Sequence, residues 1–175
     1  MGFLIGLPGI QGQHAKPTEY EVKATYLYNF GKFVEWPAHG LQAQSDSFAI
    51  CVLGENPFGP ALNATVAQET IAGKSVVAKQ IPAPQDAVNC RVLFIGSSED
   101  KRLKEILGSL GTASVLTVSD LPNFAQRGGM VQFILEGNKV RFEVNSATAE
   151  RAGLTLSSEL LKVAANVRRS VQFGD

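Results

Sequence analysis

The sequence predicts a single α/β domain with a mixed, mostly parallel sheet of five or six strands, helices on both faces and a C-terminal β-hairpin. Short apolar runs of strand length alternate with helical patterns from residue 48 onward, as is typical of α/β folds. A length of 175 residues with 45% hydrophobic content suffices for one well-filled core. Gly137 and Asn138 tolerate the positive φ of a tight turn, and they separate two strand-like segments.

The first predicted helix contains the run ATYLYNFGKFVEW and ends before Pro37, because proline drives the preceding residue away from helical geometry. Its apolar side chains occupy two faces. One face carries Tyr20, Ala24, Leu27, Gly31 and Val34, and the other carries Tyr26, Phe30 and Phe33. Two interpretations stay open for the second face. Either the helix is sandwiched between the sheet and its neighbours, or it contributes to a dimer or partner interface through Tyr26, Phe30, Phe33 and Trp36.

The remaining elements are predicted in chain order from apolar periodicity and from cap and turn residues. Strands are expected at 48–53, 74–81, 92–95 and 114–118, followed by a hairpin of 130–136 with 140–144. A short helix is expected near 61–66 and a longer amphipathic one at 100–110. Asn145 and Ser146 are candidate caps for an alanine-rich helix, and Ser157 is the candidate cap of the last helix.

Residues 1–15 are predicted to be a signal-peptide remnant or a disordered leader, and residues 16–175 to form the domain. The leader is apolar and glycine-rich and ends in alanine, but no basic residue precedes it and Pro8 interrupts it. If it is a signal, the mature protein is extracytoplasmic. No later stretch reaches the roughly 20 apolar residues that a membrane span needs.

Charge argues against nucleic acid as a partner. Basic and acidic residues are equal in number at 16 each, and the sequence contains no block or periodic row of basic residues that would bind a phosphate backbone. We interpret the pair Arg168 and Arg169 as structural, since it follows a predicted helix whose carboxyl end favours cations.

The two cysteines allow two interpretations. Cys51 lies in an apolar strand and Cys90 immediately precedes another, so a disulfide between neighbouring strands is feasible. In the chain-entropy model it would stabilise the fold by about 4 kcal/mol. In a reducing cytosol, two buried free thiols are the favoured alternative. The compartment decides, and an extracytoplasmic one favours the bridge.

Residues that could carry chemistry are few. His14 lies in the leader and His39 in a polar loop, and no metal-ligand spacing is present, so we predict no cofactor and no metal. Ser97, Ser98 and Asp120 follow strands at the carboxyl edge of the sheet, where open α/β sheets bind ligands. The alternative, which we favour, is that the serines and Asp100 cap the next helix and that Asp120 is a turn acid.

Three segments resemble the YfiR family of bacterial periplasmic regulators: ATYLYNFGKFVEWP, FAICVLGENPFG and the long stretch 115–164. They occur in order and cover most of the chain after the leader. The resemblance implies a non-enzymatic periplasmic protein that binds the periplasmic sensor part of a membrane diguanylate cyclase and restrains it. Lower cyclic-di-GMP, and hence less biofilm and exopolysaccharide, would follow.

The resemblance also implies a homodimer and sequestration by an outer-membrane lipoprotein. Cys51 and Cys90 fit the family's N-terminal cysteine pair, but this chain lacks a second pair in its C-terminal half. Two alternatives remain. A periplasmic small-molecule-binding sensor would use Ser97, Ser98 and Asp120. A small hydrolase would need His39 or an activated serine, and the sequence shows no nucleophile–base pair for it.

Overall fold

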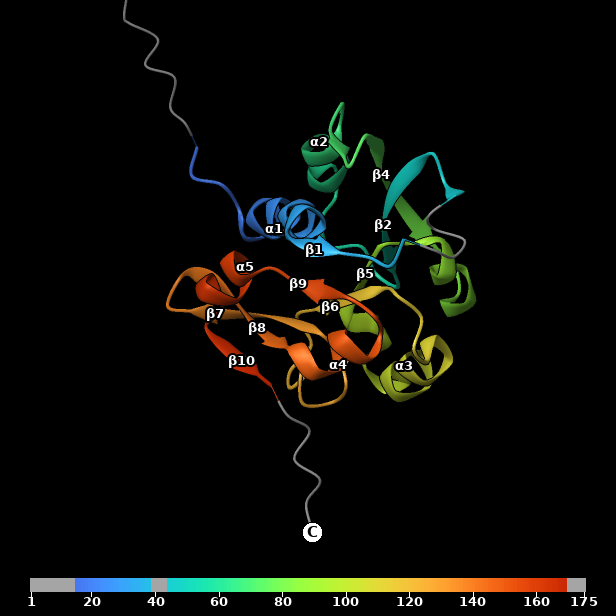
Figure 1. Cartoon of the computed structure of the whole chain (residues 1–175). Helices are drawn as coiled ribbons and strands as arrows, with labels where there is room; N and C mark the ends of the chain where they lie inside the picture. Colours follow the sequence, from blue (N-terminus) through green and yellow to red (C-terminus); the bar gives the residue numbers. More distant parts are fainter. Residues whose placement is uncertain (1–14, 39–43, 170–175) are drawn as a thin grey trace, which may run out of the picture.

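The computed structural model describes residues 15–38 and 44–169 (Figure 1). Its helices are α1 (Glu19–Phe33), α2 (Ala61–Val66), α3 (Leu103–Leu110), α4 (Ser146–Arg151) and α5 (Ser158–Val163), with 3₁₀ helices η2 (Pro84–Asn89) and η3 (Ser97–Arg102). Its strands are β1 (Val34–Glu35), β2 (Ser47–Leu53), β3 (Thr70–Ile71), β4 (Lys74–Ile81), β5 (Val92–Ile95), β6 (Leu116–Ser119), β7 (Val131–Glu136), β8 (Lys139–Asn145), β9 (Thr155–Leu156) and β10 (Asn166–Arg168).

The main sheet has the strand order β10-β8-β7-β6-β5-β2-β4-β3. Its β7–β8 and β3–β4 pairs are antiparallel, and its other neighbouring pairs are parallel. The prediction of a mixed, mostly parallel sheet is therefore confirmed. The predicted count of five or six strands is wrong, because the described sheet has eight. The two additional strands, β3 and β10, have two and three residues, too few to show a period in the sequence.

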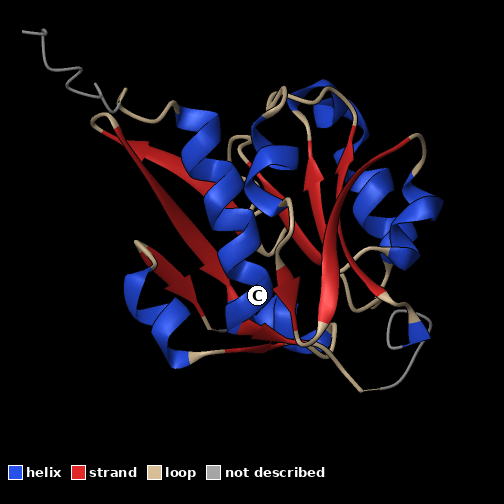
Figure 2. Cartoon of the chain, turned by 90° about the horizontal axis from the view of Figure 1, so that it is seen from above, coloured by secondary structure: helices blue, strands red, loops and turns tan. Residues whose placement is uncertain are grey.

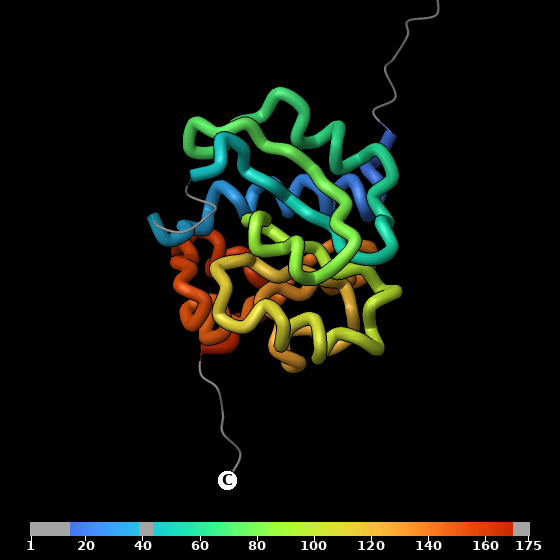
Figure 3. Tube along the Cα trace, turned by 90° about the vertical axis from the view of Figure 1, so that its right-hand side faces the viewer, coloured from blue at the N-terminus to red at the C-terminus, as the bar shows by residue number. Residues whose placement is uncertain are grey.

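The sheet curls around α1, which lies between its two halves. Figure 2 shows α1 running between the long β7–β8 hairpin and the strands of the other half. In Figure 3, the blue helix lies between the cyan-to-green and the orange-to-red parts of the chain. The Phe30 ring lies 5.1 Å from the Phe142 ring, centroid to centroid, and 6.0 Å from that of Phe133. β7 and β8 therefore cover Phe30, on the second apolar face of α1, as the sandwiched interpretation expects.

A glycine lets α1 approach the other half of the sheet closely. A Cβ atom at position 31 would lie 2.7 Å from Ile71 Cδ1 and 3.0 Å from the Phe48 ring. Only hydrogen therefore fits at Gly31 without moving these side chains.

The opposite face of the sheet has its own core under α3 and η2. Leu103, Ile106 and Leu110 of α3 are buried there against Leu93 and Ile95 of β5. Helices thus cover both faces, as predicted.

The predicted hairpin and caps are present. Glu136 pairs with Lys139 across Gly137, whose φ is +61°, and Asn138. Asn145 caps α4 by accepting a hydrogen bond from Thr148 N, and Ser157 caps α5 by accepting one from Leu160 N. The hairpin is not the end of the sheet, however, because β10 pairs in parallel with β8.

Candidate functional site

Asp120, at the carboxyl end of β6, is held by two side chains of α1. Its Oδ2 accepts hydrogen bonds from the Tyr20 hydroxyl at 2.7 Å and from Lys23 Nζ at 3.0 Å. Lys23 is only 3% exposed, and its Nζ also lies 3.5 Å from Glu19 Oε2. Asp120 lies between β6 and the turn that follows it, and it also has a role in packing. Its carboxylate neutralises a buried ammonium and fastens α1 to the sheet.

The same contacts change the acidity of Tyr20. Burial is the larger cause, and the hydrogen bond to Asp120 adds to it; both raise the pKa of the Tyr20 phenol above its ordinary value. The neutral phenol is the form that donates to Asp120, so the interaction is maintained at neutral pH.

The serines at the end of β5 are placed differently from each other. Ser98 Oγ accepts a hydrogen bond from Glu55 N at 2.8 Å, so Ser98 fastens the loop after β2. Ser97 begins η3 and is exposed. No side chain caps η3, and Asp100 lies within it, where it pairs with Arg127 at 2.7 Å. The predicted capping role of the serines and Asp100 is therefore wrong.

A Cβ at Gly96 would overlap the Glu55 carbonyl oxygen, which shows how closely the loop after β2 covers this edge. At this edge Ser98 and Asp120 make hydrogen bonds within the protein, while Ser97 and Ser98 are both exposed. Among the described hydrogen bonds and ion pairs, none joins Ser97, Ser98 and Asp120 to one another.

The four predicted interface residues are placed in three different ways: Tyr26 and Phe33 are partly exposed, Phe30 is buried, and Trp36 lies elsewhere. Tyr26, Phe30 and Phe33 line a small pocket of about 180 Å³ together with α5 residues that include Val163. Phe30 is 1% exposed, so the expectation that it lies at a surface is wrong: β7 and β8 cover it. Phe33 is 40% exposed and Val163 60%. We call Tyr26, Phe33 and Val163 the α1–α5 surface.

Trp36 lies apart from that surface. Its ring packs against Phe48 at 5.2 Å, and its Nε1 donates a hydrogen bond to Arg91 O at 3.2 Å. Half-buried in this way, Trp36 joins the segment after α1 to β2 and to the residue before β5.

Cys51 of β2 forms a disulfide with Cys90, which lies between η2 and β5. Both residues are at most 1% exposed. The bridge is thus part of the core between the sheet and α3, and its position is structural.

Sequence reasoning missed an arginine-lined pocket of about 750 Å³ between the segment 125–128, α4 and β10. Arg168 is a strand residue of β10, so the interpretation of Arg168 and Arg169 as cations following a helix is wrong. The four arginines of the pocket stand at positions 127, 151, 168 and 169. A sequence signal was absent, because only the fold brings these positions together.

A metal site requires clustered ligand side chains, which can be sought in the described part of the chain. No group of three or more His, Cys, Asp or Glu side chains there is arranged to hold a metal ion. His14 and His39, which the hydrolase alternative invokes, lie outside the described residues, as do residues 1–14 of the predicted leader. Among the described helices, none combines the length and apolarity needed to cross a membrane.

Two solved structures share this fold. A conserved domain protein from Vibrio cholerae matches with a TM-score of 0.58 and 12% identity, over 88% of this chain and 62% of that one. An ABC domain in complex with L-Trp from Streptococcus pneumonia matches with a TM-score of 0.56 and 11% identity, over 82% of this chain and 60% of that one. The chain thus spans about three fifths of each, and at these identities the likeness concerns the fold alone.

A family model described as YfiR/HmsC-like matches residues 20–165. The match begins in α1, includes both cysteines and extends past α5, so it covers both cores of the domain. Membership of this family suggests a periplasmic regulatory protein. On a match of this extent, the chain belongs to the YfiR/HmsC-like family.

Proposed function

We propose that this protein is a non-enzymatic periplasmic regulator that binds the periplasmic sensor part of a membrane-bound diguanylate cyclase and restrains it. Cyclic-di-GMP, and with it biofilm and exopolysaccharide output, would then fall. The observation that carries the proposal is the YfiR/HmsC-like match over residues 20–165. Homodimerisation and release by an outer-membrane lipoprotein belong to the same proposal.

The buried disulfide supports the compartment. Disulfides persist in oxidising compartments such as the periplasm and are rare in the cytosol. The Cys51–Cys90 bridge lies inside the core, where it stabilises the fold. A role in an oxidising compartment is consistent with this position.

The occupied sheet edge favours a regulator over a sensor at that edge. The Asp120 carboxylate is bound to Tyr20 and Lys23, and Ser98 holds the Glu55 amide. A ligand that bound the Asp120 carboxylate or the Ser98 hydroxyl would have to compete with these internal contacts. The sensor alternative at Ser97, Ser98 and Asp120 therefore has less support than regulation by protein contact.

We place the partner contact on the α1–α5 surface. Phe33 and Val163 are large apolar side chains that remain 40% and 60% exposed and line one shallow pocket. Contiguous exposed apolar groups are typical of interaction sites. Binding there would restrain the cyclase only as far as the regulator prefers the inactive state over the active one.

The decisive experiment measures cyclic-di-GMP in the native host after deletion of the gene. Complementation uses one version with a full export signal and one without. We expect cyclic-di-GMP to rise on deletion and to return to its original level only with the exported version. An unchanged level on deletion would contradict restraint of a cyclase, and rescue by the unexported version would contradict the periplasmic site.

The surface assignment is tested in the same strain with an exported Phe33→Ser/Val163→Ser double variant. We expect this variant to leave cyclic-di-GMP near the level of the deletion strain. Val88→Ser is the matched control, because Val88 is 42% exposed but lies in η2, on the other face of the sheet. Full rescue by the double variant, or equal failure of the control, would remove the α1–α5 surface from the proposal.

A further inference from the structure

We infer that the arginine-lined pocket between the segment 125–128, α4 and β10 binds a small anion that carries a phosphate group. The pocket has a volume of about 750 Å³, and Arg127, Arg151, Arg168 and Arg169 all line it. None of the described residues that line it is acidic. The chain as a whole has a formal net charge of zero, so this is a local concentration of positive charge.

The arginines of the pocket differ in what neutralises them. Arg127 Nη1 pairs with Asp100 Oδ1 at 2.7 Å, and its Nη2 donates to the Asp100 carbonyl at 3.0 Å. Its charge is therefore compensated by a carboxylate that is not among the lining residues. This pair fixes one wall of the pocket and contributes little net charge.

Neutral groups hold the guanidinium groups of Arg151 and Arg168. Arg151 Nη2 donates to Thr148 Oγ1 at 3.1 Å. The Gln126 amide is oriented so that its nitrogen donates a hydrogen bond to Asn123 O. Its oxygen then accepts a hydrogen bond from Arg168 Nη2 at 3.0 Å. Among the described residues, no carboxylate forms a salt bridge with Arg151, Arg168 or Arg169. Within the described part of the chain, the charges of Arg151 and Arg168 are therefore positioned but not cancelled by a carboxylate, and each guanidinium keeps further N–H donors.

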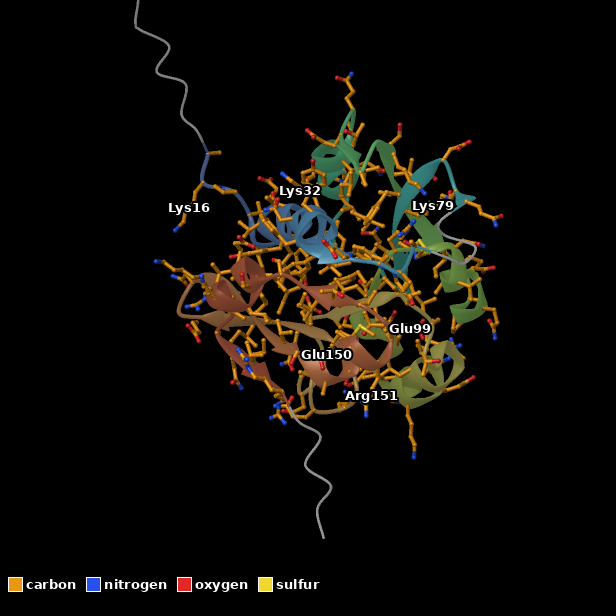
Figure 4. The ribbon with its side chains drawn as sticks, in the orientation of Figure 1. Lys16, Lys32, Lys79, Glu99, Glu150 and Arg151 are labelled. Carbon is orange, nitrogen blue, oxygen red and sulfur yellow. A yellow bond between two sulfur atoms is a disulfide. The ribbon has the colours of Figure 1, made fainter. Side chains whose placement is uncertain are left out.

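The walls of the pocket are joined by internal hydrogen bonds. Asn145 Nδ2 donates to Ala125 O at 2.9 Å, and Ser146 Oγ donates to Arg168 O at 2.9 Å. The buried Gln132 side chain accepts from Ala125 N at 3.1 Å. The bonds of Asn145 and Ser146 thus connect the start of α4 to the segment 125–128 and to β10. Figure 4 shows the Arg151 side chain on α4. These bonds fix the walls of the pocket before a ligand arrives, which lowers the ordering cost of binding.

The geometry selects the ligand class. A guanidinium binds the oxygens of a phosphate through a planar fork of donors. Arg151 of α4 and Arg168 of β10 present such forks from two segments and suit a phosphate group, and the volume lies within the range of small-molecule sites. A free phosphorylated compound and an anionic lipid headgroup share this chemistry. The inference does not depend on the proposed cyclase partner.

The test is isothermal titration calorimetry of the full chain with pyrophosphate at low ionic strength. We expect saturable binding that weakens about tenfold or more in Arg151→Gln and in Arg168→Gln, since each removes charge-assisted hydrogen bonds. Arg141→Gln is the matched control: it removes the same charge from β8, but Arg141 pairs with Glu136 and does not line the pocket. Thermal unfolding of each variant checks that the fold is retained.

A second measurement separates the two phosphate sources. The same proteins are incubated with phosphatidylglycerol vesicles and with phosphatidylcholine vesicles. Binding to phosphatidylglycerol vesicles but not to phosphatidylcholine vesicles assigns the site to a lipid headgroup, if Arg151→Gln and Arg168→Gln abolish this binding. Pyrophosphate binding without vesicle binding assigns it to a free phosphate compound. If neither probe binds saturably, or if Arg141→Gln weakens binding as much as the pocket variants, the inference is wrong.

Discussion

Lys23 is a nearly buried cation whose position depends on one carboxylate from the sheet. Its ammonium is 3.0 Å from Asp120 Oδ2 and 4.4 Å from the centroid of the Tyr20 ring. Removing Asp120 would leave this nearly buried ammonium with only the more distant Glu19 carboxylate, at 3.5 Å, and breaking a buried pair in this way costs more than the pair itself contributes. Asp120, which follows Tyr20 by 100 positions and Lys23 by 97, thus decides where the start of α1 lies.

The raised pKa of Tyr20 predicts a specific loss of stability at high pH. Tyrosine ordinarily loses its proton near pH 10, so above that pH the unfolded chain ionises while the buried phenol keeps its proton. The folded state then binds more protons than the unfolded state, and stability falls as pH rises. We expect the free energy of unfolding to fall more steeply above about pH 10 in the wild type than in Tyr20→Phe. Urea unfolding across a pH series measures this, and parallel curves would contradict it.

Phe30 and Phe33 are three positions apart but differ in burial, so their truncation should differ in cost. Phe30 is 1% exposed and packs on β7 and β8, and Phe30→Ala should destabilise the fold by about 3–5 kcal/mol. Phe33 is 40% exposed, and Phe33→Ala should cost about 1 kcal/mol or less. Denaturant unfolding of both variants decides the matter. Equal losses would show that α1 is not embedded in the sheet as described.

At the scale of elements, two glycines predict opposite effects of the same substitution. At Gly96, between β5 and η3, an added Cβ would meet the backbone oxygen of Glu55, which cannot rotate away. Gly96→Ala should therefore destabilise the fold by about 1–3 kcal/mol. Gly108 lies in α3, where an added Cβ would meet no atom within 4 Å apart from its chain neighbours and the helix's own backbone, so Gly108→Ala should stabilise the fold by up to about 1 kcal/mol. Thermal melts compare the two, and a change of the same sign in both would contradict this.

The disulfide predicts a large stability difference that depends on its loop. Cys51 and Cys90 are 39 positions apart, and closing such a loop stabilises the fold by about 4 kcal/mol in the chain-entropy model. We expect Cys51→Ala/Cys90→Ala to lose roughly this amount in urea unfolding. The control is a reductant: dithiothreitol should lower the stability of the wild type and leave the double variant unchanged. Equal stability of both oxidised proteins would contradict the structural role of the bridge.

At the scale of the whole molecule, α1 fills the interior of the curled sheet and joins its two halves. Its side chains Leu27 and Phe30 belong to the same core cluster as Phe94 of β5 and Phe142 of β8. Deletion of residues 15–33 would therefore leave both halves without cover. We expect this truncated chain to lose its cooperative thermal transition, whereas deletion of residues 1–14, outside the family match, should preserve it. A cooperative melt of the chain without α1 would contradict this arrangement.

The sequence by itself determined the α/β class, the Gly137–Asn138 turn, the Asn145 and Ser157 caps and the family of the chain. Each depends on local periodicity, on cap or turn residues, or on motifs contiguous in the chain. Tertiary structure alone decided that Phe30 is buried while Phe33 is exposed, because β7 and β8 curl over one part of α1. It also decided that Asp120 binds Lys23 and that Arg151 and Arg168 share a pocket. Lys23 and Asp120 are 97 positions apart in the sequence, and Arg151 and Arg168 are 17 positions apart. The order of the strands and the curl of the sheet bring these residues together, and no local pattern encodes either.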